Sequence, residues 1–68
     1  MKVFVTGVNG QLGYDVMHEL TGRGFEAVGS DIVERNEANY INLDITDQQA
    51  VTEVIRTVKP NAVIHCAA

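Results

Sequence analysis

The chain has 68 residues and a mass of 7.4 kDa, which leaves room for one small domain at most. Five Lys and Arg residues stand against nine Asp and Glu, so the formal net charge at pH 7 is −4. This acidic balance argues against nucleic acid or a membrane surface as the main partner. A hydrophobic fraction of 46% with 21% charged residues excludes intrinsic disorder, collagen and low-complexity proteins.

The size of the chain predicts that it is a portion of a larger domain. A domain this small buries only roughly 60% of the surface that its unfolded chain exposes, and the single cysteine, Cys66, has no partner for a disulfide. We therefore expect residues 1–68 to be the N-terminal portion of one domain, with no second domain. The sequence shows no signal-peptide pattern and no long apolar span. Because a lone thiol also suits a reducing compartment, we expect a cytoplasmic protein.

The first half of the chain predicts a strand, a helix and a second strand. Residues 1–5 form a short apolar run rich in β-branched residues, typical of a strand buried on both faces. Residues 11–22 carry apolar side chains at helical spacing, and Gly22 is available to close that helix. Residues 25–30 predict the second strand, and Asp31 stands just past its end.

The second half predicts a loop, a strand, a helix and a last strand. Residues 32–39 are charged and without period, so we expect an exposed loop that leads to a short strand at 40–43. Thr46, with a glutamine three residues later, matches a capping box, and Pro60 ends the helix that it begins. Residues 62–66 predict the fourth strand.

Strands that alternate with helices favour a parallel α/β sheet with right-handed crossovers. The predicted strand order is 3-2-1-4 with one helix on each face, which is the N-terminal half of a doubly wound, nucleotide-binding sheet. The fourth strand then lies at a bare edge, although its residues are apolar. We expect that edge to be covered by the remainder of the same domain or by a second copy of the chain.

A glycine pattern between the first strand and the first helix predicts a phosphate site. Residues 6–13 read Thr-Gly-x-x-Gly-x-x-Gly. Gly7 allows a tight turn, Gly10 lets the backbone approach a pyrophosphate, and Gly13 lets the helix pack close to the strand. The helix N-terminus adds unpaired N–H groups and partial positive charge. A P-loop is excluded because Tyr14, and not Lys, follows Gly13. The alternative is a purely structural turn.

Asp31 is the candidate ligand for a ribose. It lies 18 residues beyond Gly13 at the end of the second strand, where a carboxylate can accept hydrogen bonds from an adenosine ribose. The carboxylate would repel a 2′-phosphate and so favours NAD over NADP, but Arg35 in the following loop could offset that repulsion. The alternative is a solvated Asp at the start of a loop.

Residues after the third and fourth strands complete the candidate site. Asp44 and Ile45 could cover an adenine, the carboxylate accepting from its exocyclic amine; equally, Asp44 could serve the helix start at Thr46. Ala67 and Ala68 are small residues at a strand end beside the glycine turn, where a cofactor can lie against the backbone.

Three other reactive side chains are expected to have no chemical role. His65 and Cys66 end a strand predicted to be buried, so we expect a hydrogen-bonded core histidine and an inert thiol. His18 is expected on the exposed face of the first helix. The charged residues 34–37 are expected to be solvated. No group of side chains predicts a metal site.

These motifs together resemble the extended short-chain dehydrogenase/reductases, which have a Rossmann-like fold. The resemblance covers the whole chain: the glycine pattern after the first strand, the acids Asp31 and Asp44, and the small residues after the fourth strand. Within that superfamily, residues 9–13 (Asn-Gly-Gln-Leu-Gly) look like the dTDP-4-dehydrorhamnose reductases. That family often has Asn where this chain has His65.

The resemblance implies an oxidoreductase that passes a hydride from NADPH or NADH to dTDP-4-dehydro-L-rhamnose, a nucleotide-sugar, in the synthesis of dTDP-L-rhamnose for surface polysaccharide. Alternatives are another nucleotide-sugar epimerase or dehydratase, or a non-catalytic, dinucleotide-binding regulatory protein. By position, the resemblance places Gly10, Gln11 and Leu12 at the pyrophosphate, Asp31 at the ribose, Asp44 and Ile45 at the adenine, and Ala67 and Ala68 along the inner side of the cofactor. The catalytic Tyr-x-x-x-Lys of the family is missing, since His18 and Asp44 stand four residues after the two tyrosines.

Overall fold

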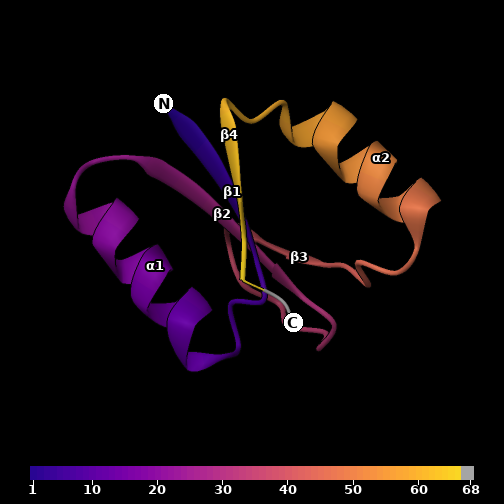
Figure 1. Ribbon diagram of the computed structural model, residues 1–68, viewed down its shortest axis with the longest axis horizontal. Coiled ribbons are helices and arrows are strands. Elements are labelled where there is room, and N and C mark those ends of the chain that lie inside the picture. Colours follow the sequence, from indigo (N-terminus) through magenta and orange to yellow (C-terminus); the bar gives the residue numbers. More distant parts are fainter. Residues whose placement is uncertain (67–68) are drawn as a thin grey trace.

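The computed structural model describes residues 1–66, which form a four-stranded sheet with one helix on each side (Figure 1). In chain order the elements are β1 (Lys2–Thr6), α1 (Gln11–Gly22), β2 (Glu26–Asp31), β3 (Tyr40–Asn42), α2 (Gln48–Val58) and β4 (Ala62–His65). All six were predicted, and most of their ends differ from the predicted ones by one or two residues.

The sheet is parallel with the order β3-β2-β1-β4, which confirms the predicted topology. Thr6 is in register with Ser30 on one side and with His65 on the other, so three strands end at the same level. The glycine turn, the loops after β2 and β3, and Cys66 after β4 therefore meet at one edge of the sheet, here called the carboxyl edge.

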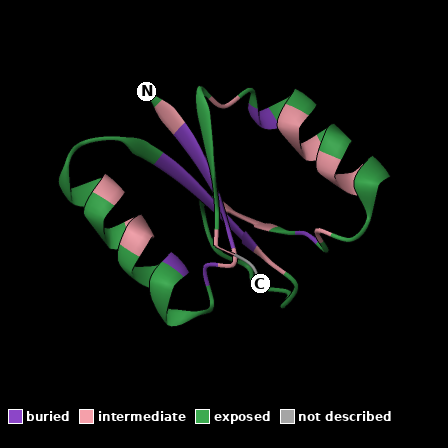
Figure 2. Cartoon of the chain, viewed as in Figure 1, coloured by how far each residue is buried: buried purple, intermediate pink, exposed green. Residues whose placement is uncertain are grey.

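Side chains alternate along the central strand β1 and build a small core on each face. Phe4 points to the α2 side, where it packs with Val28, Leu43 and Val58. The opposite cluster of Val3, Val5 and Val8 meets the apolar side of α1. Burial is concentrated in β1 and β2 (Figure 2). Each cluster holds one helix against the sheet, and the packing of α1 fixes the glycine turn at its start.

The fourth strand lies at a bare edge of the sheet, as predicted, but the burial expected of its residues is not found within the described part of the chain. All four residues of β4 are exposed, including Val63 at 50% and Ile64 at 36% relative accessibility. β4 pairs only with β1, and no described element lies on its other side (Figure 1). An apolar pattern indicates that a strand is suited to buried surroundings, and within residues 1–66 β4 has no neighbour on the side away from β1.

The start of α2 and the end of α1 differ in detail from the prediction. The cap of α2 is Asp47, whose Oδ1 accepts from the N–H of Ala50, and not Thr46. At the end of α1, Arg23 is the cap residue and the following Gly24 adopts φ +84°, so Gly24, rather than Gly22, supplies the left-handed glycine.

The connection from β2 to β3 contains no helix. Residues 32–39 are all exposed, as predicted for this loop. Neither of the two helices described is long and apolar enough to cross a membrane.

Candidate functional site

The glycine turn joins β1 to α1 at the carboxyl edge and is held to the neighbouring strand. Gly7 adopts φ +74°, a left-handed conformation that favours glycine. Its N–H and that of Val8 both donate to the carbonyl oxygen of Ser30, at 2.9 and 3.2 Å. These bonds fix the turn relative to β2.

Gly13 is required by the packing of α1 on that turn. A Cβ at this position would lie 2.1 Å from the carbonyl oxygen of Gly7 and 2.8 Å from the Cα of Val8. Both neighbours are backbone atoms, which cannot move aside as a flexible side chain can. The close approach of the helix, predicted from the motif, is therefore a feature of the structure.

At Gly10, neither a positive φ nor a close backbone neighbour requires glycine. Its φ of −80° is open to any residue, and the nearest atom to a Cβ would be the Gly7 oxygen at 3.6 Å, an ordinary contact. Gly10 is the N-cap residue of α1 and no side chain caps this end, so the first N–H groups of the helix have no side-chain acceptor. A glycine here leaves the helix N-terminus open to an approaching group.

Asp31 lies at the end of β2, next to the turn, and both of its carboxylate oxygens are engaged. Oδ2 accepts from the N–H of Asn9 at 2.8 Å, and Oδ1 accepts from the N–H of Ile32 at 2.7 Å. The side chain is therefore no free solvated acid; it fixes the turn and its own loop. A carboxylate oxygen has more than one lone pair, so both can accept again from a ligand.

A cleft of about 460 Å³ brings five of the predicted residues together at the carboxyl edge. Those five are Gly7, Gly10, Asp31, Asp44 and Ile45. The other residues that line it are Ser30, Ile32, Leu43, Thr46 and Cys66. Three more predicted residues, Gln11, Leu12 and Gly13, lie in the first turn of α1 beside the cleft but do not line it. Ala67 and Ala68 lie outside the described residues.

Asp44 organises the turn before α2. Its Oδ1 accepts from the N–H of Thr46 at 2.9 Å and from the Thr46 hydroxyl at 2.7 Å. The bond from the hydroxyl, followed by that from the N–H, lowers the pKa of the exposed Asp44 carboxyl below its ordinary value. Asp44 was predicted either to contact an adenine or to serve the start of the helix. These contacts with Thr46 support its role at the helix start.

The pKa of Asp44 gives a direct test of this turn. A lowered folded-state pKa stabilises the folded chain above the unfolded pKa, and this contribution is lost as the pH falls through the folded value. Thr46→Val removes the hydroxyl but keeps the N–H, so we expect the pKa of Asp44 to rise toward its ordinary value. An NMR titration of the carboxyl carbon from about pH 6 to 2 would measure the shift. An unchanged midpoint would contradict the assigned bond.

Two contacts beside Asp31 were missed by sequence reasoning. The side-chain oxygen of Asn9 accepts from Nη1 of Arg35 at 2.7 Å, and the Arg35 guanidinium lies over the ring of Tyr40 at 4.4 Å. Arg35 was predicted only as a charge that could act at Asp31, and Asn9 had no predicted role. The sequence did offer one signal for the role of Asn9, which is a polar residue between two glycines of the motif.

His65 and Cys66 are placed differently from the prediction. His65 is exposed, not in the core, although it is hydrogen-bonded: its Nδ1 lies 2.9 Å from the Thr6 hydroxyl. Cys66 is half-buried, packs against the cluster on the α1 side and also lines the cleft. His18 is exposed as predicted and contacts the ring of Tyr14. Within residues 1–66, no three His, Cys, Asp or Glu side chains gather to hold a metal ion.

Comparisons with known proteins give one family for this chain and several similar proteins. The family described as RmlD substrate binding domain matches residues 1–68. A dTDP-4-dehydrorhamnose reductase from Clostridium acetobutylicum superposes with a TM-score of 0.81 at 40% identity. The UDP-glucose 4-epimerase of Thermus thermophilus, solved as a complex with NAD, gives a TM-score of 0.85 at 29% identity. Methionine adenosyltransferase 2 subunit beta of Danio rerio is 33% identical over 67 residues.

The chain is much shorter than these proteins. It is covered completely by both solved structures but spans only 21% of the reductase and 24% of the epimerase. The match to the adenosyltransferase subunit covers 98% of this chain and 20% of that protein. The similarity therefore concerns the glycine turn, the first four strands and the helices between them.

Proposed function

This chain belongs to the RmlD family and has the fold of the short-chain dehydrogenase/reductases that act on nucleotide-sugars; from that premise we propose that it supplies the ADP-binding part of an NADPH- or NADH-dependent reductase. The proposed reaction of the whole protein is the reduction of dTDP-4-dehydro-L-rhamnose to dTDP-L-rhamnose. The similar reductase of Clostridium acetobutylicum supports this substrate.

One observation carries the dinucleotide part of the proposal: Gly10 leaves the N-terminus of α1 open, and nothing in the packing requires a glycine there. Unpaired N–H groups and the helix dipole at this point suit a pyrophosphate. The Asp31 carboxylate, at the same cleft, suits the hydroxyls of a ribose. Ile45 offers an apolar surface for an adenine. These residues fit an adenine dinucleotide, which supplies the hydride when bound.

The proposal assigns no hydride-transfer residue to this chain. Tyr14 and Tyr40 have no lysine four residues on, and Tyr14 lies on α1 in contact with His18. The general acid and the nucleotide-sugar pocket of the complete protein are accordingly proposed to lie in other sequence.

A second candidate is a non-catalytic subunit that binds the dinucleotide. The specific observation in its favour is the match to a protein named as subunit beta of another enzyme. The two candidates differ in turnover: a reductase oxidises NADPH with the keto-sugar, whereas a binding subunit does not.

The experiment is a pair of measurements on the complete natural protein that contains this chain. Consumption of NADPH or NADH with dTDP-4-dehydro-L-rhamnose, with dTDP-L-rhamnose as product, would support the reductase. UDP-glucose serves as the alternative substrate, and its epimerisation without reduction of the keto-sugar would overturn the proposed reaction. Binding without any turnover would favour the subunit.

Gly10→Ala tests the pyrophosphate site separately. Since a Cβ here makes only an ordinary contact, we expect the free energy of unfolding to change by less than about 1 kcal/mol. We expect the Kd for the dinucleotide to rise about tenfold or more, because a methyl group would stand where the pyrophosphate approaches the backbone. Unchanged affinity in the folded variant would overturn the proposed site.

A further inference from the structure

Asn9 precedes Gly10 in the glycine turn, and no other asparagine of the chain precedes a glycine. The backbone nitrogen that follows an asparagine can attack the side-chain carbonyl carbon, Cγ, and close a ring. A Cβ on the following residue hinders this attack, and glycine has none. Asn9 is exposed, and the nearest atom to a Cβ at Gly10 would be the Gly7 oxygen at 3.6 Å. Nothing in the packing therefore stands in the way of ring closure.

The backbone N–H of Gly10, the nucleophile of such a ring closure, is weakly held. It donates to the carbonyl oxygen of Gly7 at 3.3 Å, which is longer than an ordinary N–H···O bond. The preceding N–H, that of Asn9, donates instead to the carboxylate of Asp31 at 2.8 Å. The turn is thus fixed at Asn9, while the nitrogen of Gly10 keeps a proton that it can give up to solvent.

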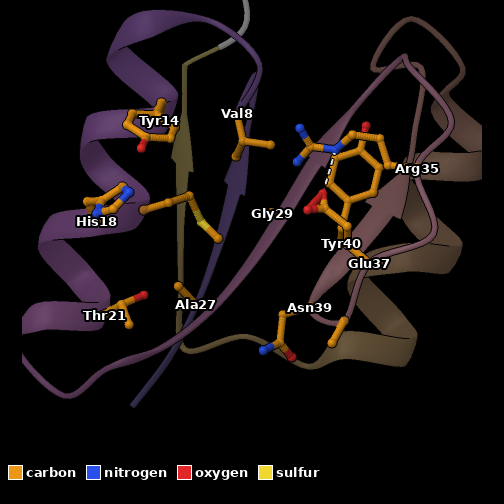
Figure 3. A pocket seen from close by; sticks show the side chains of 12 residues that line it. Val8, Tyr14, His18, Thr21, Ala27, Gly29, Arg35, Glu37, Asn39 and Tyr40 are labelled. Carbon is orange, nitrogen blue, oxygen red and sulfur yellow. Dashed lines mark ion pairs between the residues drawn. The ribbon is translucent and has the colours of Figure 1, made fainter.

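The side-chain carbonyl of Asn9 is polarised by a cation. Nη1 of Arg35 donates to Oδ1 of Asn9 at 2.7 Å, and a guanidinium keeps its charge at all working pH values. Arg35 is held in place by an ion pair with Glu37 at 2.8 Å and by the ring of Tyr40, whose centre lies 4.4 Å from Cζ (Figure 3). Attack at Cγ moves negative charge onto Oδ1, and a preorganised donor aimed at such an oxygen stabilises that charge.

We propose that Asn9 is a site of spontaneous modification, promoted by Arg35, in which a cyclic imide forms between Asn9 and Gly10 and opens to aspartate or isoaspartate. The Gly10 nitrogen loses its proton to solvent and bonds to Cγ of Asn9. The C–N bond of the side-chain amide then breaks, and its nitrogen takes up a proton and leaves as ammonia. Water adds to either imide carbonyl and cleaves that C–N bond. One water is consumed for each ammonia released, and nothing is oxidised or reduced.

Both products alter the turn at the candidate dinucleotide site. Aspartate adds negative charge next to Gly10, where the pyrophosphate is proposed to approach the backbone. Isoaspartate also lengthens the backbone between Asn9 and Gly10 by one CH₂ group, so the turn and the start of α1 no longer keep their relative positions. This consequence rests on the proposed function, whereas the modification itself needs no ligand. A bound dinucleotide would cover Gly10, so the unliganded protein is expected to be modified faster.

The first measurement incubates the complete natural protein in mildly alkaline buffer and follows its asparagines by peptide mass spectrometry, with an isoaspartate assay on the same samples. We expect Asn9 to convert faster than Asn36 and Asn39, which are also exposed but precede glutamate and tyrosine. Conversion of Asn9 that is no faster than at these two positions would overturn the inference.

Arg35→Met tests the role of the guanidinium. We expect the conversion of Asn9 to slow about tenfold, as for the loss of one donor to a developing oxyanion at a site that water also reaches. Arg35→Lys keeps a charge and should restore part of the rate. Arg56→Met is the matched control, since it also removes a guanidinium paired with a glutamate, but on α2, and it should leave the rate unchanged.

An unchanged or faster conversion in Arg35→Met would mean that the bond to Arg35 restrains Asn9, and the proposed promotion would be wrong. Unfolding of a variant is recognised by repeating the measurement in urea. There the contact between Arg35 and Asn9 is lost in every protein, so the difference between Arg35→Met and the unmodified protein should disappear. A difference that persists in urea would contradict an effect of the folded turn.

The consequence for the ligand is measured separately. Asn9→Asp reproduces one product, and we expect it to raise the Kd for NADH about tenfold. Saturating NADH should slow the conversion of Asn9 in the unmodified protein. If Asn9 converts as proposed but Asn9→Asp binds NADH normally and NADH gives no protection, the modification stands and the dinucleotide does not lie on this turn. If Asn9 does not convert while NADH binds, the inference fails and the proposed function stands.

Discussion

Gly13→Ala is expected to destabilise the folded protein by at least about 3 kcal/mol and to remove dinucleotide binding with it. The added Cβ would lie 2.1 Å from the Gly7 carbonyl oxygen and 2.7 Å from its carbonyl carbon. Relief of these overlaps requires α1 to move away from the glycine turn. That movement would open the cluster of Val3, Val5 and Val8, against which α1 packs. Urea unfolding of the complete natural protein measures the loss.

Gly22→Ala is the control within the same helix. A Cβ at Gly22 would meet nothing within 4 Å, and alanine favours a helix over glycine by up to about 1 kcal/mol. The same substitution should therefore leave the stability unchanged or raise it slightly. A Gly13→Ala protein as stable as the unmodified one would contradict the close packing of α1 on the turn.

The fold was predictable because local signals and the burial pattern agree. A β-branched run marks β1 and a short, largely uncharged run marks β2; the buried residues of both strands face the two helices. The glycines mark the turn that joins β1 to α1. Because a helix separates β1 from β2, the strands pair in parallel through right-handed crossovers, and few strand orders are then possible. The observed order β3-β2-β1-β4 is the predicted one.

The incorrect details depended on information that a local pattern does not contain. Thr46 and Asp47 are both good cap residues, and the choice between them depends on which carboxylate or hydroxyl can reach the backbone. Asp44 engages the Thr46 hydroxyl, so Asp47 is left to cap α2. The exposure of His65 depends on what lies beyond β4, and the pattern of a strand does not specify its neighbour.

The candidate site was predicted where backbone geometry dictates the residue, and not where side chains meet across loops. Gly7 has a positive φ and Gly13 a close backbone neighbour, which are the physical reasons for which such motifs carry glycine. The bond between Asn9 and Arg35 joins residues 26 positions apart. It depends on the path of a loop without regular structure, and no periodicity encodes that path.

Asp31→Asn is expected to weaken NADH binding by about tenfold to 100-fold, and NADPH binding by less. Each carboxylate oxygen of Asp31 accepts a different backbone N–H, one from Asn9 and one from Ile32. An amide has a single acceptor oxygen, so its nitrogen must face one of these donors, and the loop or the turn must shift. The variant also loses the charged acceptor proposed for the ribose hydroxyls. The loss is smaller for NADPH because the removed carboxylate would repel its 2′-phosphate.

Asp15→Asn provides the control, since it removes one negative charge from α1 while its contact with the Gln11 amide can be kept by the asparagine oxygen. Calorimetric titration of both dinucleotides gives the ratio of the two affinities, which is more informative than either value. A general loss of structure would lower both affinities together and leave their ratio unchanged. If Asp31→Asn binds NADH as tightly as the unmodified protein, Asp31 serves only the turn and its own loop. The ribose would then have to be bound by other residues.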